Sequence, residues 1–158
     1  LNGQPVHGAM HPEIGHLRLR RAPGDDFPGI CPFHGDCTEG LVSGPALRAR
    51  FGCDPAAISN DDPRWHLVAC DLAELVSAIL LMTSVQRVLL GGSVILSRPF
   101  LLSGVGDAVV KRLSAYLPRV DVGSVEQLVR LPGLGTLAGP LGAIAVGQRA
   151  LQGSMIRH

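Results

Sequence analysis

The chain has 158 residues, of which 46% are hydrophobic and 17% are charged, and its formal net charge is +1. This length can bury one sizeable core, while the near-neutral charge argues against the clustered basic surface that nucleic-acid binding requires. The longest apolar stretch, Leu67 to Met82, contains Asp71 and Glu74 and is shorter than the roughly 20 apolar residues of a membrane span. We therefore expect a buried helix there, with neither a nucleic-acid nor a membrane partner.

The first residues predict irregular structure followed by one strand. Leu1–Pro5 is typical of a hairpin turn, and residues 6–10 of a short strand or loop. From His16 to Arg21 apolar and polar residues alternate, which predicts a strand with Leu17 and Leu19 on one face. The arginines of this segment are interpreted as a solvated edge.

Four potential metal ligands follow one another within 22 residues, and the last three are spaced three apart: His16, Cys31, His34 and Cys37. A zinc ion needs such a set of nitrogen and sulfur ligands to complete a tetrahedron. The loop from Pro23 to Gly29 leads into this cluster, and its turn residues suit a zinc knuckle. With four protein ligands the ion has no open position, so we expect a structural zinc and no metal-assisted hydrolysis.

Two other interpretations of the cluster stay open. Cysteine is often buried and histidine often lies in polar loops without any ligand. A disulfide between Cys31 and Cys37 is the second alternative, but no signal peptide is visible and cytosolic disulfides are rare. The four cysteines without a secretory leader indicate a reducing, cytoplasmic compartment.

Helices are predicted on both sides of a polar loop at residues 52–63. Thr38 is a good N-cap for a short helix with Glu39 in its first turn, and residues 46–51 continue as a second helical segment after Gly44-Pro45. A long helix begins around Pro63 and runs to Met82. Glu39 then lies near the metal cluster, and a solvent-facing capping role is its alternative interpretation.

The remainder predicts alternating strands and helices. Residues 86–95 indicate a buried strand ending at Gly91-Gly92, where an ordinary tight turn is the alternative to a nucleotide-binding turn. Residues 99–117 predict a helix, and an edge strand is expected around residues 125–130. Small residues from Leu134 onward predict a terminal helix, extending through residues 145–158, that packs closely on the sheet.

Several of these motifs resemble one known family. The segments Glu13-Ile-Gly-His16, Cys31-Pro-Phe-His-Gly-Asp-Cys37-Thr-Glu39-Gly40 and Ser43-Gly-Pro-Ala46 are similar to the ROK family of sugar kinases, and within it to bacterial fructokinases. The segment Leu134-Gly-Thr-Leu-Ala-Gly-Pro-Leu-Gly-Ala143 resembles the terminal signature of the family. The resemblance runs through the whole chain but covers only the second half of such a kinase.

The resemblance implies an α/β fold, namely the carboxyl-terminal lobe of the actin-like or hexokinase-type (ribonuclease H-like) ATPase fold. Residues 1–158 would form a single lobe, with the amino-terminal lobe absent. It implies ATP-dependent phosphorylation of D-fructose to fructose 6-phosphate, with Mg²⁺ on the phosphates. The catalytic aspartate belongs to the absent lobe, so the isolated chain is expected to be an incomplete fragment of low or no activity. Alternatives are a glucose or mannose kinase of the same family, or a non-catalytic zinc-stabilised sugar-binding or regulatory module.

The resemblance also implies roles for individual residues. Glu13, His16 and Glu39 would bind the hydroxyls of the hexose, and His16 would bind zinc through its other ring nitrogen. Gly91 and Gly92 would lie against the nucleotide. The family commonly forms dimers, so a homodimer is a further expectation.

Overall fold

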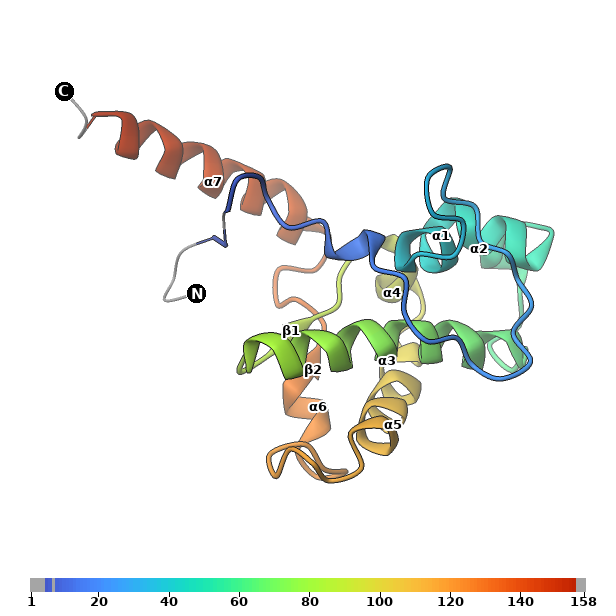
Figure 1. Ribbon diagram of the computed structural model, residues 1–158. Helices are drawn as coiled ribbons and strands as arrows, with labels where there is room; N and C mark the ends of the chain where they lie inside the picture. The colour runs from blue at the N-terminus through green and yellow to red at the C-terminus, as the bar shows by residue number, and fades with distance from the viewer. Residues whose placement is uncertain (1–4, 7, 156–158) are drawn as a thin grey trace.

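The computed structural model describes residues 5–6 and 8–155, so most of the turn predicted at Leu1–Pro5 lies outside the described residues. The described part is mixed α/β and rich in helix (Figure 1). The helices are α1 (Thr38–Val42), α2 (Gly44–Phe51), α3 (Arg64–Thr83), α4 (Ser93–Ser97), α5 (Leu101–Leu113), α6 (Val125–Leu128) and α7 (Ala138–Met155). The strands are β1 (Val88–Leu89) and β2 (Val129–Arg130), and short 3₁₀ turns are η1 (Ile14–His16), η2 (Pro55–Ala57) and η3 (Gly135–Leu137).

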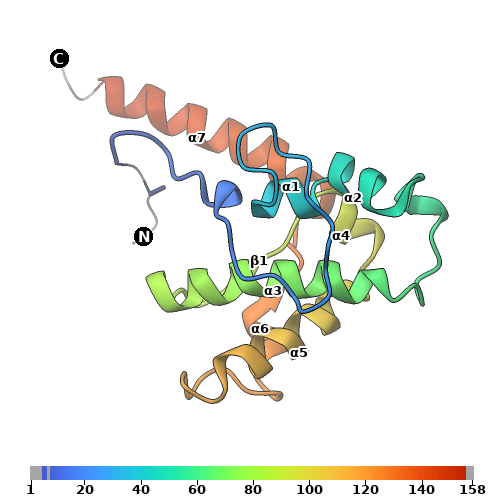
Figure 2. The ribbon, with the colours of Figure 1, turned by 45° about the vertical axis from the view of Figure 1, so that its right-hand side comes forward.

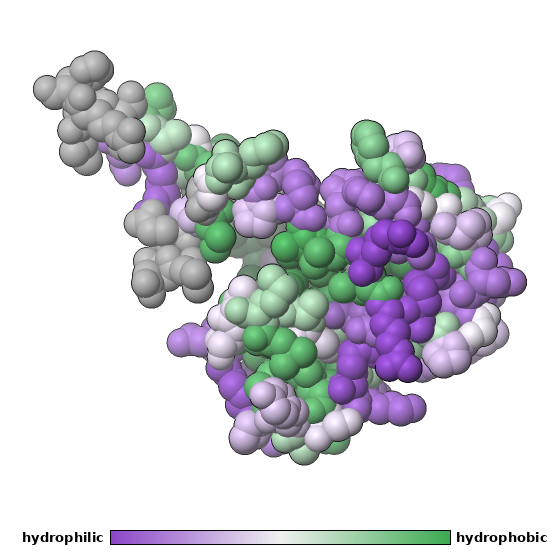
Figure 3. Space-filling model, in the orientation of Figure 1, coloured by the Kyte–Doolittle hydropathy of each residue, from purple (hydrophilic) through white to green (hydrophobic). Residues whose placement is uncertain are grey.

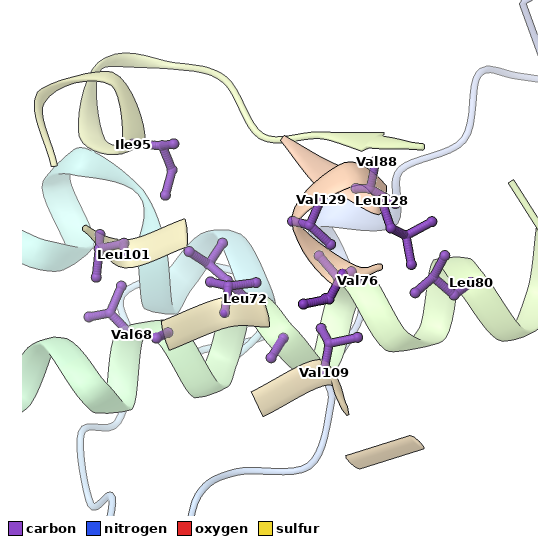
Figure 4. Packing of buried hydrophobic residues seen from close by; sticks show 14 of the residues in the cluster. Val68, Leu72, Val76, Leu80, Val88, Ile95, Leu101, Val109, Leu128 and Val129 are labelled. Atoms are coloured by element: carbon purple, nitrogen blue, oxygen red, sulfur yellow. The ribbon is translucent and has the colours of Figure 1, made fainter. Parts of the chain in front are cut away.

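The long central helix α3 organises the core, as its apolar pattern predicted. By length and composition alone α3 is also able to cross a membrane, yet nine of its residues are buried here, including the charged Asp71. Its buried side chains meet those of α5, β1 and β2 in one apolar cluster (Figure 4). Figure 4 shows members from each of these elements pointing toward one another: Val68, Leu72, Val76, Leu80, Val88, Leu101, Val109 and Val129. A charged residue in the middle of the apolar helix fits a core helix with an internal ion-pair partner.

The sheet is smaller than expected. Strands β1 and β2 pair in parallel, with Val88 opposite Val129 and Leu89 opposite Arg130. The edge strand predicted around residues 125–130 is wrong for its first four residues, which form α6. The reason lies just upstream, where Asp121 and Ser124 exchange side-chain hydrogen bonds with each other's backbone N–H at 2.8 and 3.0 Å. These bonds close a turn, and the chain leaves this turn as the helix α6. The strand β2 therefore begins only after α6 ends.

The strand predicted from His16 to Arg21 is also wrong. His16 ends η1, and the following residues are irregular. The carbonyl of Leu17 accepts the backbone N–H of Thr38 at 3.0 Å, but no strand pairs with this segment in the described part of the chain. Leu17 is 37% exposed, so the alternation had no apolar face to bury. Residues 8–10 are bends, which agrees with the loop among the two alternatives predicted for residues 6–10.

The terminal helix forms as predicted, but its predicted close packing is wrong. In both ribbon views α7 projects from the rest of the molecule (Figures 1 and 2). An added Cβ at Gly139 or Gly142 would meet no atom within 4 Å. Large apolar side chains stay at the surface along the helix and just before it: Leu134, Leu137, Leu141, Ile144, Val146 and Leu151. Among the described residues of α7, Gly139, Gly142 and Gly147 therefore have no close packing partner.

Two leucine truncations measure this difference between core and terminal helix. We expect Leu101→Ala to destabilise the chain by about 2–5 kcal/mol, because Leu101 is 2% exposed and its removal leaves a cavity beside α3. Leu151→Ala makes the same chemical change at a 69% exposed site and should change stability by less than about 0.5 kcal/mol. Urea unfolding followed by circular dichroism gives both values. Equal losses would mean that α7 is packed as tightly as α5.

Candidate metal centre

The four predicted ligands meet in space. His16 comes from the end of η1, and the other three come from the loop that precedes α1. Their ligand atoms all lie within 4.8 Å of one another. His16 Nδ1 is 3.8 Å from Cys31 Sγ and 3.6 Å from Cys37 Sγ, and His34 Nδ1 is 3.7 Å from Cys31 Sγ. A zinc tetrahedron with ordinary Zn–S and Zn–N bonds has nitrogen-to-sulfur edges of about 3.6 Å, so the donor set fits zinc.

Backbone hydrogen bonds give this loop its shape. Cys31 and Gly35 donate to each other's carbonyl at 3.1 and 2.9 Å, which closes a tight turn carrying His34 at its tip. Ile30 N–H donates to the carbonyl of Gly40 at 3.0 Å and ties the loop to α1. Gly35 has a φ of 66°, a left-handed conformation that glycine adopts without strain. Because the turn closes through its backbone, the spacing of three between ligands brings their side chains to one side.

The two thiols differ in their protonation. The backbone N–H of His34, followed by that of Phe33, lowers the pKa of Cys31 to about 6. Burial raises the pKa of Cys37, which has no exposed surface. Cys31 is therefore a thiolate near neutral pH and can bind a metal directly, whereas Cys37 must release its proton when the metal binds. Neither cysteine is part of a disulfide in this structure.

Glu39 faces the metal cluster through His16. Glu39 Oε2 lies 3.4 Å from His16 Nε2, while His16 Nδ1 faces the two sulfurs. A carboxylate on the outer nitrogen of a metal-binding histidine fixes its tautomer and ring orientation. The Glu39 side chain is 60% exposed, so its carboxylate is also open to solvent. The second nitrogen of His16, expected to face a sugar hydroxyl, thus faces Glu39 here.

The other predicted site residues are Glu13, Gly91 and Gly92. Glu13 Oε1 pairs with His11 Nε2 at 2.5 Å, and both side chains are more than half exposed. The backbone carbonyl of Glu13 accepts the N–H of His16 at 3.0 Å, but among the described residues the Glu13 side chain makes no hydrogen bond or ion pair with the four ligands. Gly91 and Gly92 follow β1 after one intervening residue, Leu90, and lead into α4, and Gly92 has a φ of 92°. The chain thus turns at the carboxyl end of a parallel strand, as the sequence predicted.

One group of charged residues was missed by the sequence analysis. Arg21, Asp25, Arg50 and Asp71 form buried ion pairs next to the metal loop, although the arginines near Arg21 were interpreted as a solvated edge. A signal was present, because Asp71 falls on the apolar face of the long helix, directly before Leu72. A carboxylate in such a place needs a buried cationic partner. Its partners, however, lie far away in sequence.

Comparison with known proteins gives one family throughout. The sequence pattern of the ROK family matches residues 1–150. A protein of Bacillus subtilis (strain 168) named "Putative fructokinase" is 34% identical over 153 residues, covering 96% of this chain and 51% of that protein. Proteins named "Fructokinase" from Lactococcus lactis subsp. cremoris and Zymomonas mobilis subsp. mobilis are 38% and 36% identical, covering 83% and 92% of this chain. The chain covers 44% and 48% of those two, so it spans about half the length of the relatives it matches.

Proposed function

The chain belongs to the ROK family, and we propose that it is the zinc- and hexose-binding half of an ATP-dependent fructokinase. The observation that carries this proposal is the meeting of His16, Cys31, His34 and Cys37 with Glu39 seated against His16. A sugar kinase needs rigidly held acceptors for hydroxyl groups, and a metal loop next to an exposed carboxylate provides one. The fructokinase names of three relatives at 34–38% identity support fructose as the hexose.

The residues of this chain would bind and orient the substrates. Zinc, held by His16, Cys31, His34 and Cys37, would supply a rigid structural joint without an open position for substrate. Glu39 would accept hydrogen bonds from hexose hydroxyls and hold the His16 ring in place, and Glu13 would supply a second carboxylate acceptor. Gly91 and Gly92 would let the nucleotide approach the backbone at the end of β1, with Mg²⁺ on its phosphates.

The general base is proposed to come from outside this chain. Phosphoryl transfer to a hydroxyl uses a carboxylate that takes the hydroxyl proton, and no aspartate here matches the family's motif for it. The exposed apolar side chains of α7 support a second half, since a helix with so few polar residues is normally covered. A cytoplasmic location fits the free thiols of the metal centre.

The test is hexose-dependent ADP formation by the purified chain, alone and mixed with a separately expressed amino-terminal half of a fructokinase. We expect no turnover from the chain alone and phosphorylation in the mixture, with a higher kcat/KM for fructose than for glucose or mannose. Glu39→Gln should raise the KM for the hexose in the mixture. Robust turnover by the chain alone would refute the half-site proposal. A preference for glucose or mannose would refute fructose, and a mixture that binds hexose without ADP formation would indicate a non-catalytic module.

A further inference from the structure

Four charged side chains are buried together between the metal loop, α2 and α3. Arg21 Nη2 lies 2.7 Å from Asp25 Oδ2, and Arg50 Nη2 lies 2.7 Å from Asp71 Oδ2. These two pairs are cross-linked, because Arg50 Nη1 is 3.1 Å from Asp25 Oδ2 and Arg21 Nε is 3.8 Å from Asp71 Oδ1. The side chains of Asp25, Arg50 and Asp71 are only 2–3% exposed. We call these four residues the buried charge network.

The network lies in the segment that separates the first metal ligand from the second. Residues 17–30 connect His16 to Cys31 and contain neither a helix nor a strand. Backbone hydrogen bonds hold the two ends of this segment, from Thr38 N–H to the Leu17 carbonyl and from Ile30 N–H to the Gly40 carbonyl, both at 3.0 Å. A connection of this length without regular structure needs further anchors if its ends are to stay in register.

Side-chain contacts of the network supply those anchors. Asp25 is bound by Arg50 of α2, and the Arg50 guanidinium also covers the ring of Phe27, 4.8 Å from its centroid. Arg21 reaches Asp71 of α3. In the space-filling view, strongly hydrophilic side chains gather where this segment crosses α3 (Figure 3). The middle of the segment is therefore held to both helices by charge.

The network also reaches the metal loop itself. Asp36 lies between His34 and Cys37 in the sequence, and its Oδ2 is 4.0 Å from Arg21 Nη1. Its Oδ1 accepts a hydrogen bond from Arg18 Nε at 2.6 Å. Two arginines from the segment after His16 thus contact the residue between two other ligands. The charges tie both parts of the ligand set to one another.

Stability alone does not account for these charges. Removing two charges from water costs more than their attraction returns in many proteins, and apolar replacements of a buried pair are often neutral or stabilising. Here the hydrogen bonding is also incomplete, because Asp71 Oδ1, Arg21 Nε and Arg50 Nε are buried without a hydrogen-bond partner among the described residues. What the network does provide is a fixed geometry, since each of its two arginines contacts both Asp25 and Asp71.

We propose that the buried charge network is a positioning device that holds His16 in register with Cys31, His34 and Cys37 and thereby sets the affinity of the metal centre. The proposal rests on the metal centre proposed above. Without the network, the segment from residue 17 to residue 30 would sample more conformations before the metal binds. Residues that orient metal ligands from outside typically change metal affinity about 10–100-fold.

A paired substitution separates positioning from folding. The double variant Arg50→Met/Asp71→Leu removes one cation and one anion and leaves Arg21 paired with Asp25. We expect this variant to fold, with a metal-free thermal midpoint near that of the metal-free wild type, and to bind zinc about tenfold more weakly in competition with a chelator. The visible absorption of the cobalt-substituted protein should also change, because it reports ligand geometry.

The matched control removes another arginine–carboxylate pair, whose carboxylate lies on α3 as Asp71 does. Arg112 of α5 contacts Glu74 of α3, and Arg112→Met/Glu74→Leu should leave zinc affinity and the cobalt spectrum unchanged. If the first variant fails to fold, Arg21→Met/Asp25→Leu gives the complementary test, since it leaves Arg50 paired with Asp71. Wild-type zinc affinity in a folded network variant would overturn the positioning role. Failure of the wild type itself to bind zinc would overturn the metal centre and this proposal with it.

Discussion

We expect Cys37→Ser to abolish tight zinc binding and to unfold the loop that precedes α1. Cys37 has no exposed surface, and its Sγ lies 3.6 Å from His16 Nδ1 at the centre of the ligand set. Loss of a direct ligand should cost more than the roughly 10–100-fold that outer residues cost. Metal binding and folding are linked at structural zinc sites, so the free energy of unfolding should fall as well.

The measurement is zinc content together with thermal unfolding, each with and without a strong chelator. Wild-type protein should hold one zinc and lose stability on chelation, whereas Cys37→Ser should hold none and should not respond to the chelator. Cys53→Ser is the matched control, because Cys53 is exposed and lies outside the ligand set. A Cys37→Ser protein that keeps one tightly bound zinc would refute the four-ligand site.

The parts of this structure that could be predicted are those whose signal is local in sequence. The ligand set was visible because three of its members lie within seven residues of sequence, from Cys31 to Cys37. The helices from Thr38 to Phe51 and around residues 64–83 were predicted because apolar periodicity and turn residues act over a few residues. The glycine turn after β1 was predicted for the same reason. The N-cap predicted at Thr38 was wrong, because Cys37 holds that position and the Thr38 hydroxyl donates to the Leu17 carbonyl instead.

The parts that failed depend on partners distant in sequence. The alternation after His16 resembled a strand, but a strand needs a neighbour, and ion pairs with Asp36 and Asp71 hold this segment instead. The terminal helix was expected to pack on the sheet, since small residues favour close approach. That pattern specifies a close contact without specifying which surface provides it. The contact between Glu39 and His16 could likewise not be predicted from the spacing of the two residues in the sequence.

Gly40 of α1 and Gly44 of α2 lie four residues apart, and alanine at these two positions should have very different effects. We expect Gly40→Ala to disrupt the metal centre and Gly44→Ala to leave it intact. A Cβ on Gly40 would lie 2.1 Å from the carbonyl oxygen of Gly35 and 2.9 Å from the backbone nitrogen of Cys31. Those are backbone atoms of the turn that presents the ligands, so they cannot move aside without displacing Cys31. A Cβ on Gly44 would meet nothing within 4 Å other than its chain neighbours and the backbone of its own helix.

The two substitutions are chemically identical, so their difference isolates the space beside the metal loop. Gly44 is the first residue of α2 and precedes Pro45, so little of the roughly 1 kcal/mol by which alanine exceeds glycine in a helix interior is gained there, and Gly44→Ala should change stability by less than about 1 kcal/mol. Gly40→Ala should lose stability at the upper end of the roughly 1–3 kcal/mol that overpacking costs, together with its zinc. Urea unfolding and zinc content measure both effects. Equal zinc content in the two variants would mean that the loop has room at Gly40, which would contradict the close contact between α1 and the turn at Gly35 on which the geometry of the metal centre depends.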